Sequence, residues 1–147
     1  MTIALSHGGT TQYASLKRSQ ELLVGTKEGV AILEQDAAGS WRMSHRGLSD
    51  LHISSLILPP KTDLIFAGAF HGSIHASGDG GRTWERSDTG LTQHDVYSLA
   101  WVERVDGVRL YAGTEPAHLF YSDDFGSNWT ELPGIRNVES APSWSFP

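Results

Sequence analysis

The residues that could do chemistry in this chain are histidines, carboxylates and one arginine in short polar segments. His52, His71 and Asp95 could form a polar cluster, and Glu115 and Arg136 stand in comparable segments. Imidazoles and carboxylates act as general acids and bases, bind ligands and coordinate metals. A His/His/Asp metal site is conceivable, but the seven histidines are scattered without His-x-x-x-His spacing. We therefore predict no metal and no cofactor, and the competing interpretation is solvated loop residues.

Composition excludes several other chemistries. The chain has 147 residues and no cysteine, so disulfides, zinc–thiolate sites and cysteine nucleophiles are absent. The net charge of −6 disfavours nucleic acid and anionic membranes as partners, because both require a basic patch. No apolar run approaches the ~20 residues of a membrane span, and the N-terminus lacks the features of a secretion signal. These absences predict a chain without a membrane span and fit a cytoplasmic location.

A threefold internal repeat decides the predicted architecture. Three short apolar segments each end in Gly-Thr or Gly-Ala, and each glycine precedes a tryptophan by 16 residues: 25 to 41, 68 to 84 and 113 to 129. The step between repeats is 43 residues and then 45. A constant internal offset within a slightly variable period indicates one supersecondary unit with variable connections.

Each unit is expected to contain four short strands, because runs of apolar and β-branched residues are bounded by Gly, Asp and Ser. The expected strands are 13–17, 22–25, 29–34 and 41–45, then 53–58, 64–69, 73–77 and 84–87, then 96–101, 110–114, 119–122 and 128–132. Four antiparallel strands in about 43 residues match one propeller blade. The predicted fold class is therefore all-β, with about three four-stranded antiparallel propeller blades.

The turn before each tryptophan carries the most specific motif. Residues 77–84 read Ser-Gly-Asp-Gly-Gly-Arg-Thr-Trp and residues 122–129 read Ser-Asp-Asp-Phe-Gly-Ser-Asn-Trp. Both fit Ser-x-Asp-x-Gly-x-x-Trp, of which the first unit keeps only Asp36 and Trp41. The aspartate can accept hydrogen bonds from its own turn, and the glycine permits a positive φ. The tryptophan can bury a large ring between sheets while its N–H finds an acceptor.

We assign a structural role to these repeated residues. The set is Asp36, Trp41, Ser77, Asp79, Gly81, Trp84, Ser122, Asp124, Gly126 and Trp129. The alternative is that Asp79 and Asp124 are catalytic or bind a metal. An acid that recurs in every unit is better explained as a construction element, because an active site needs it in one place only.

This motif resembles the Asp box, or BNR repeat, of sialidase-like β-propellers, and the resemblance covers nearly all of residues 20–147. It implies that the aspartate turns lie away from the ligand site. The ligand face is then formed by the loops that join second to third strands and by the loops that cross to the next blade. Residue types at equivalent loop positions differ between units, so we place the candidate binding residues there: His52, His71, Asp95, Glu115 and Arg136.

The leading functional hypothesis is a non-catalytic Asp-box module that binds a glycan or protein ligand or serves in assembly, as in sortilin-type propellers and photosystem assembly factors. The alternative is a sialidase-like glycoside hydrolase with catalytic residues partly outside this chain. Sialidases pair an arginine cluster with a Tyr/Glu nucleophile and an Asp acid/base, and this chain lacks their Arg-Ile-Pro segment. Asp50, Asp95, Glu115 and Glu139 could supply a carboxylate pair, and no catalytic residue is assigned.

Three blades do not close a ring, because closed propellers have at least four. We divide a single partial propeller, 1–147, into blades 10–47, 48–90 and 91–135, with 136–147 starting a fourth. Uncovered sheet faces mark interfaces. Either the chain is part of a longer propeller, which we favour, or two chains form a six-bladed homo-oligomer. In both cases we expect the isolated monomer to be unstable.

Overall fold

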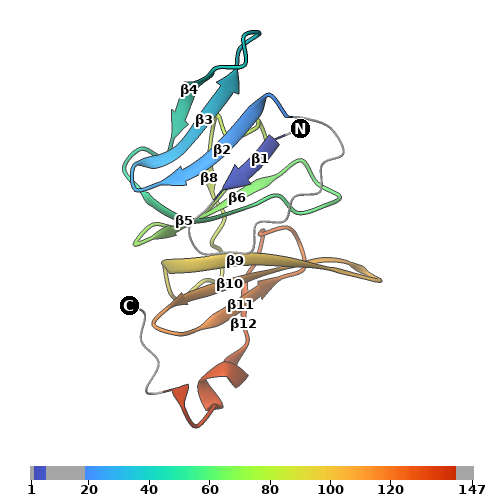
Figure 1. Cartoon of the computed structure of the whole chain (residues 1–147). Helices are drawn as coiled ribbons and strands as arrows, with labels where there is room; N and C mark the ends of the chain where they lie inside the picture. The colour runs from blue at the N-terminus through green and yellow to red at the C-terminus, as the bar shows by residue number, and fades with distance from the viewer. Residues whose placement is uncertain (1, 6–18, 142–147) are drawn as a thin grey trace.

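The computed structural model describes residues 2–5 and 19–141. In these residues twelve strands form three four-stranded sheets, and a short 3-10 helix, η1 (Pro133–Asn137), follows the last strand. The sheets follow one another along the chain, and Figure 1 shows the second sheet between the other two. This arrangement confirms the predicted all-β class.

Sheet 1 contains β1 (Thr2–Leu5), β2 (Glu21–Thr26), β3 (Gly29–Gln35) and β4 (Trp41–Gly47), in that order. The last three strands are antiparallel, as expected. In contrast, β1 pairs with β2 in parallel, so the prediction of antiparallel pairing throughout is wrong here. A parallel connection needs a dozen or more residues, and the chain between β1 and β2 is long enough. The predicted strand 13–17 lies outside the described residues.

Sheets 2 and 3 are antiparallel meanders that contain every strand expected for their units. Sheet 2 consists of β5 (His52–Ile57), β6 (Ile65–Phe70), β7 (Ser73–Ser77) and β8 (Glu85–Arg86). Sheet 3 consists of β9 (Asp95–Arg104), β10 (Gly107–Glu115), β11 (Leu119–Ser122) and β12 (Thr130–Glu131). In the predicted start of a fourth unit, the first residues end η1, and residues 142–147 lie outside the described part.

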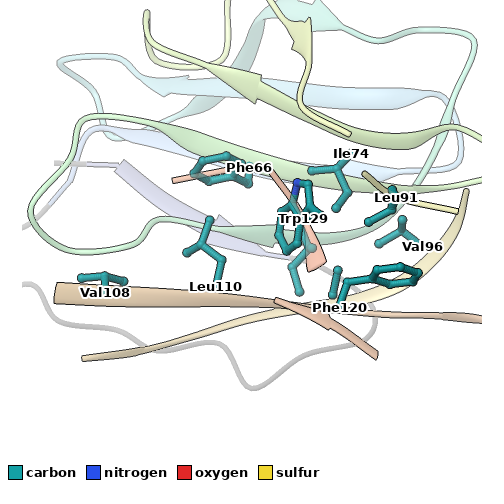
Figure 2. Packing of buried hydrophobic residues seen from close by; sticks show 10 residues of the cluster. Phe66, Ile74, Leu91, Val96, Val108, Leu110, Phe120 and Trp129 are labelled. Atoms are coloured by element: carbon teal, nitrogen blue, oxygen red, sulfur yellow. The ribbon is translucent and has the colours of Figure 1, made fainter. Parts of the chain in front are cut away.

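The sheets pack face to face through two apolar clusters. The cluster between sheets 1 and 2 includes Leu23, Val30, Ile32, Ile53, Ile65 and Ala67. The cluster between sheets 2 and 3 includes Phe66, Ile74, Leu99, Leu110, Phe120 and Trp129, most of which Figure 2 labels. Successive side chains of a strand point to opposite faces, so β6 contributes to both clusters. Sheet 2 is therefore buried on both faces.

Two turns, which we call the acidic turns, are closed by their own side chains. In the Ser77–Trp84 turn, the Ser77 hydroxyl accepts from the Gly81 N–H at 2.9 Å and donates to Asp79 Oδ1 at 2.8 Å. The Ser122–Trp129 turn repeats both bonds at 2.8 Å with its own serine, aspartate and glycine. Both glycines, Gly81 and Gly126, have φ near +80° to +90°, which explains why glycine is needed there.

Candidate functional site

The β2–β3, β6–β7 and β10–β11 turns lie at the same end of the sheets as the segments that connect one sheet to the next. The Gly29 N–H donates to the Leu51 carbonyl at 2.8 Å, and the Ser73 N–H donates to the His94 carbonyl at 2.8 Å. These bonds join the first two of the three turns to the connecting segments. We call this end of the molecule the crossing face, and the acidic turns close the other ends of the strands.

His71 and Asp95 are in direct contact on the crossing face. His71 lies in the β6–β7 turn and Asp95 begins β9, so the two residues come from neighbouring sheets. His71 Nδ1 lies 2.8 Å from Asp95 Oδ1, while the imidazole remains exposed. His71 has a φ of 57°, a conformation that costs a residue with a Cβ about 1–2 kcal/mol. Such conformations concentrate at functional sites.

Phe70 joins the other members of the group. Its ring centroid lies 3.9 Å from that of His71, 5.7 Å from that of Tyr97 and 6.3 Å from that of His52. The rings of Tyr97 and His52 meet it edge-on, a favourable arrangement for aromatic groups. The structure therefore brings His52, His71 and Asp95 together around an aromatic residue.

Glu115 extends the group onto β10. It is the Cα partner of Asp95 across the β9–β10 ladder, and directly opposed residues share one face of a sheet. Its Oε2 atom is buried and has no hydrogen-bond partner. A buried acceptor without a donor is costly, so this carboxylate is an unusual feature of the crossing face. We define the crossing-face cluster as His52, Phe70, His71, Asp95, Tyr97 and Glu115.

Arg136, the fifth predicted binding residue, is held elsewhere. Its Nε lies 2.9 Å from Glu131 Oε1, and His118 Nδ1 contacts the same oxygen at 2.8 Å. Arg46, the other arginine near the crossing face, donates to the Glu28 carbonyl at 2.6 Å in sheet 1. The structure therefore ties the two arginines to glutamates of separate sheets.

Asp79 is engaged by its own turn. It accepts the N–H groups of Arg82 and Thr83 at 3.0 and 2.8 Å, together with the hydroxyls of Thr83 and Ser77. These bonds, with the Thr83 hydroxyl the largest cause, hold the pKa of Asp79 well below its ordinary value. A carboxylate with so low a pKa is a poor general base near neutral pH.

Asp124 has the same arrangement in the second acidic turn. Partial burial raises the pKa of Asp124, but hydrogen bonds from Asn128 and Ser122 outweigh that effect and lower it. The Asn128 side-chain amide and backbone N–H lie 2.8 and 2.9 Å from its two carboxylate oxygens. The hydrogen-bonding capacity of both turn aspartates is thus used within the fold.

One group has the residue types of a hydrolase triad but not the triad's sequence of hydrogen bonds. It consists of Ser73, Asp88 and His94. The Ser73 hydroxyl lies 2.9 Å from Asp88 Oδ2 and 3.1 Å from His94 Nδ1, so serine stands between the other two. In a triad, histidine stands between serine and aspartate. The Ser73 side chain is also completely buried. This group therefore ties the β6–β7 turn to the segment before β9.

Sequence analysis missed Phe70 and Tyr97. Phe70 stands two residues after the repeat glycine, where the first unit has Lys27 and the third has Glu115. His71 is predicted as a binding residue because residue types differ between units at its loop position. The same criterion applies to Phe70. Tyr97 gave no such signal, because only the edge-on ring contact across two sheets assigns it to the cluster.

No protein-family model matches this sequence, and comparison with curated proteins finds no match. Within residues 2–5 and 19–141, no group of three or more His, Asp or Glu side chains is placed to hold a metal ion. No helix in that part of the chain is long and apolar enough to cross a membrane. The crossing-face cluster is therefore the basis for a functional assignment.

Proposed function

We propose that this chain is a non-catalytic binding module of the Asp-box β-propeller type, in which the three sheets are consecutive blades. Sheets 2 and 3 use equivalent residues to pack on the sheet before them, since Ile65 and Ala67 correspond to Leu110 and Ala112. The hydrogen bonds within the acidic turns repeat from sheet 2 to sheet 3. Both repetitions support the proposal.

The proposed ligand is a glycan that binds to the crossing-face cluster. The observation that carries this assignment is the 2.8 Å contact between His71 and Asp95 beside the Phe70 ring. Aromatic rings offer a flat apolar surface for a sugar ring, and carboxylates accept hydroxyl protons. Glu115 adds a second carboxylate opposite Asp95 across the β9–β10 ladder. A mostly apolar surface with a few fixed polar groups is typical of ligand sites.

A glycan array probed with the full chain tests this assignment. For each glycan that binds, we expect Phe70→Ala and Asp95→Asn to weaken binding about tenfold or more, as for central contact residues. Asp106→Asn, in the exposed β9–β10 turn, is the charge-matched control and should bind as the wild type does. An array without any bound glycan contradicts the ligand class, and undiminished binding by both variants places the site elsewhere.

A sialidase-like glycoside hydrolase is the second candidate, because Asp95 and Glu115 oppose each other across two strands. Glycosidases commonly place two carboxyl groups on either side of the scissile bond. Incubation with a panel of chromogenic glycosides separates the two functions. Hydrolysis that disappears in both Asp95→Asn and Glu115→Gln indicates the hydrolase, whereas glycan binding without hydrolysis supports the binding module.

A further inference from the structure

Sheet 1 has an apolar face with no packing partner among the described residues. The strand register places Leu22, Leu33 and Met43 side by side across β2, β3 and β4. Val24 and Trp41 lie on the same side, because residues two apart in a strand share a face. Trp41 is 44% exposed and Met43 is 54% exposed. Leu22, Val24 and Leu33 are half-buried, so the exposed part of this face is Trp41 and Met43, and exposed apolar side chains that lie together mark an interaction surface.

The equivalent positions in sheets 2 and 3 indicate what kind of surface packs against the open face of sheet 1. Leu22 and Val24 stand three residues and one residue before their repeat glycine, and Ile65 and Ala67 hold the same places in sheet 2. Ile65 and Ala67 are buried against sheet 1, and residues 110 and 112 are buried in the same way against sheet 2. The open face of sheet 1 therefore carries the pattern with which this chain packs one sheet onto another.

Sheet 3 presents the complementary type of open face. Tyr111 and Tyr121 are Cα partners on β10 and β11, and they alternate with the residues that pack on sheet 2. The equivalent pair in sheet 1, Leu23 and Ile32, is buried against sheet 2. The two tyrosines thus occupy the places that this fold uses to receive a following sheet, and both are only half-buried.

Arg109 and Asp123 fix the shape of the sheet 3 face. The Arg109 guanidinium lies 4.1 Å from the centre of the Tyr121 ring, a cation–π contact. It also forms two hydrogen bonds with Asp123, at 2.7 and 2.6 Å. A paired arginine stacked on a ring loses little entropy when it is covered. The face is therefore preorganised for contact.

We propose that two copies of this chain assemble, with the open face of sheet 1 in each copy packed against the open face of sheet 3 in the other. Tyrosine, tryptophan, methionine and arginine, the types exposed on these faces, are enriched at protein interfaces. Each copy carries one open face of each kind, so the two open faces of one copy match the two open faces of the other. A two-fold dimer covers every open face.

This inference rests on the proposed propeller architecture, but not on the glycan site. Figure 1 shows sheets 1 and 3 at opposite ends of the stack, and Trp41, Met43 and Tyr121, which the test changes, are not members of the crossing-face cluster. The competing arrangement, sheet 1 against sheet 1, leaves the tyrosines of sheet 3 uncovered. Substitutions on sheet 3 therefore distinguish the two dimers.

Sedimentation velocity of the full chain at several concentrations is the test, and we expect a mass of about twice 16.0 kDa. Trp41→Glu on sheet 1 and Tyr121→Arg on sheet 3 should each raise the dimer dissociation constant about tenfold or more. An equimolar mixture of the two variants should recover the dimer. One interface of the mixed dimer is then wild type on both sides, and the other joins the introduced carboxylate to the introduced guanidinium.

Val105→Glu is the control, because Val105 is fully exposed in the β9–β10 turn outside both faces, and it should leave the mass unchanged. Far-ultraviolet circular dichroism checks that each variant folds, and Met43→Glu replaces Trp41→Glu if that variant does not. A wild-type chain that stays monomeric overturns the proposal, whatever the glycan array shows. A dimer that survives Tyr121→Arg but not the sheet 1 substitution also overturns it.

Discussion

The turn that leads into β4 of sheet 1 and the turn that leads into β12 of sheet 3 share an aspartate and a tryptophan, but their tryptophans differ in structure. In sheet 3, Trp129 is 4% exposed, and its indole N–H donates to the Ser87 carbonyl in the segment after β8 at 2.7 Å. In sheet 1, Trp41 is 44% exposed and is the first residue of β4, opposite Gln35. The tryptophan of the repeat is therefore part of the core in sheet 3 and part of the surface in sheet 1.

This difference shows that the aspartate and the tryptophan of the repeat are separable features. Asp36 still accepts two backbone N–H groups of its own turn, from Ala38 and Ser40, at 2.9 Å each. Its tryptophan is nevertheless exposed, because the described part of the chain holds no sheet before sheet 1. The turn is a local structure, whereas burial of the tryptophan requires a neighbouring sheet.

Truncation of the two tryptophans gives the largest expected contrast. Trp129→Ala leaves a cavity in the apolar cluster that Figure 2 shows, and should lower the free energy of unfolding by about 3–5 kcal/mol. Trp41→Ala removes an exposed ring and should cost about 0.5 kcal/mol or less. Urea unfolding measures both losses, with each variant compared with the wild type at the same low chain concentration. Equal losses in the two variants contradict the assignment of Trp41 to the surface.

Glycine substitutions sharpen the same comparison with a smaller effect. Gly126 has a φ of 80°, and a Cβ there would collide with Ser87 Oγ and lie 2.7 Å from Phe66 Cε1. Gly126→Ala should therefore cost about 3 kcal/mol, from backbone strain and overpacking together. Gly39 in the sheet 1 turn has a φ of 86°, but its nearest atom would be 3.8 Å away. Gly39→Ala should cost about 1 kcal/mol from the backbone alone.

Thermal unfolding of both glycine variants, monitored by circular dichroism, is sufficient to rank them. Gly126→Ala should melt well below Gly39→Ala. If the order is reversed, crowding by Phe66 is not what makes Gly126 necessary.

The strands and turns of sheets 2 and 3 could be predicted because their signals are local. Alternating apolar residues define each strand, and one serine, one aspartate and one glycine close each acidic turn. The constant offset of 16 residues also looked local, but its cause differs between units. Gly25 pairs with Val30, five residues on, whereas Gly68 pairs with Ile74, six residues on. The residue missing from the first turn is regained before Trp41, which is the first residue of β4, whereas the tryptophans of the other two units each precede their strand by one residue.

The remaining features depend on contacts between segments that are distant in sequence. The parallel pairing of β1 with β2 carries no local signal, because the pattern of a short apolar strand does not specify its direction. In the candidate site, the loop positions of His71 and Asp95 could be predicted from divergence between repeats. Their contact with the Phe70 ring could not, because it depends on how sheet 2 meets sheet 3.

The smallest expected effect concerns acid and the two acidic turns. The pKa of Asp79 is depressed, so its ionised form stabilises the folded chain at pH values above its ordinary pKa of 3.8. That contribution is lost progressively as pH falls below this value, because the unfolded chain then binds the proton while the folded chain resists it. The stability difference between wild type and Asp79→Asn should therefore shrink from pH 5 to pH 3.

Asp124→Asn should show a weaker trend, because partial burial opposes the hydrogen bonds to Asp124. Urea midpoints across this range, with Asp106→Asn as the control for surface charge, measure the trend. Parallel curves for wild type and Asp79→Asn would show that the bonds from Thr83 do not favour the ionised carboxylate.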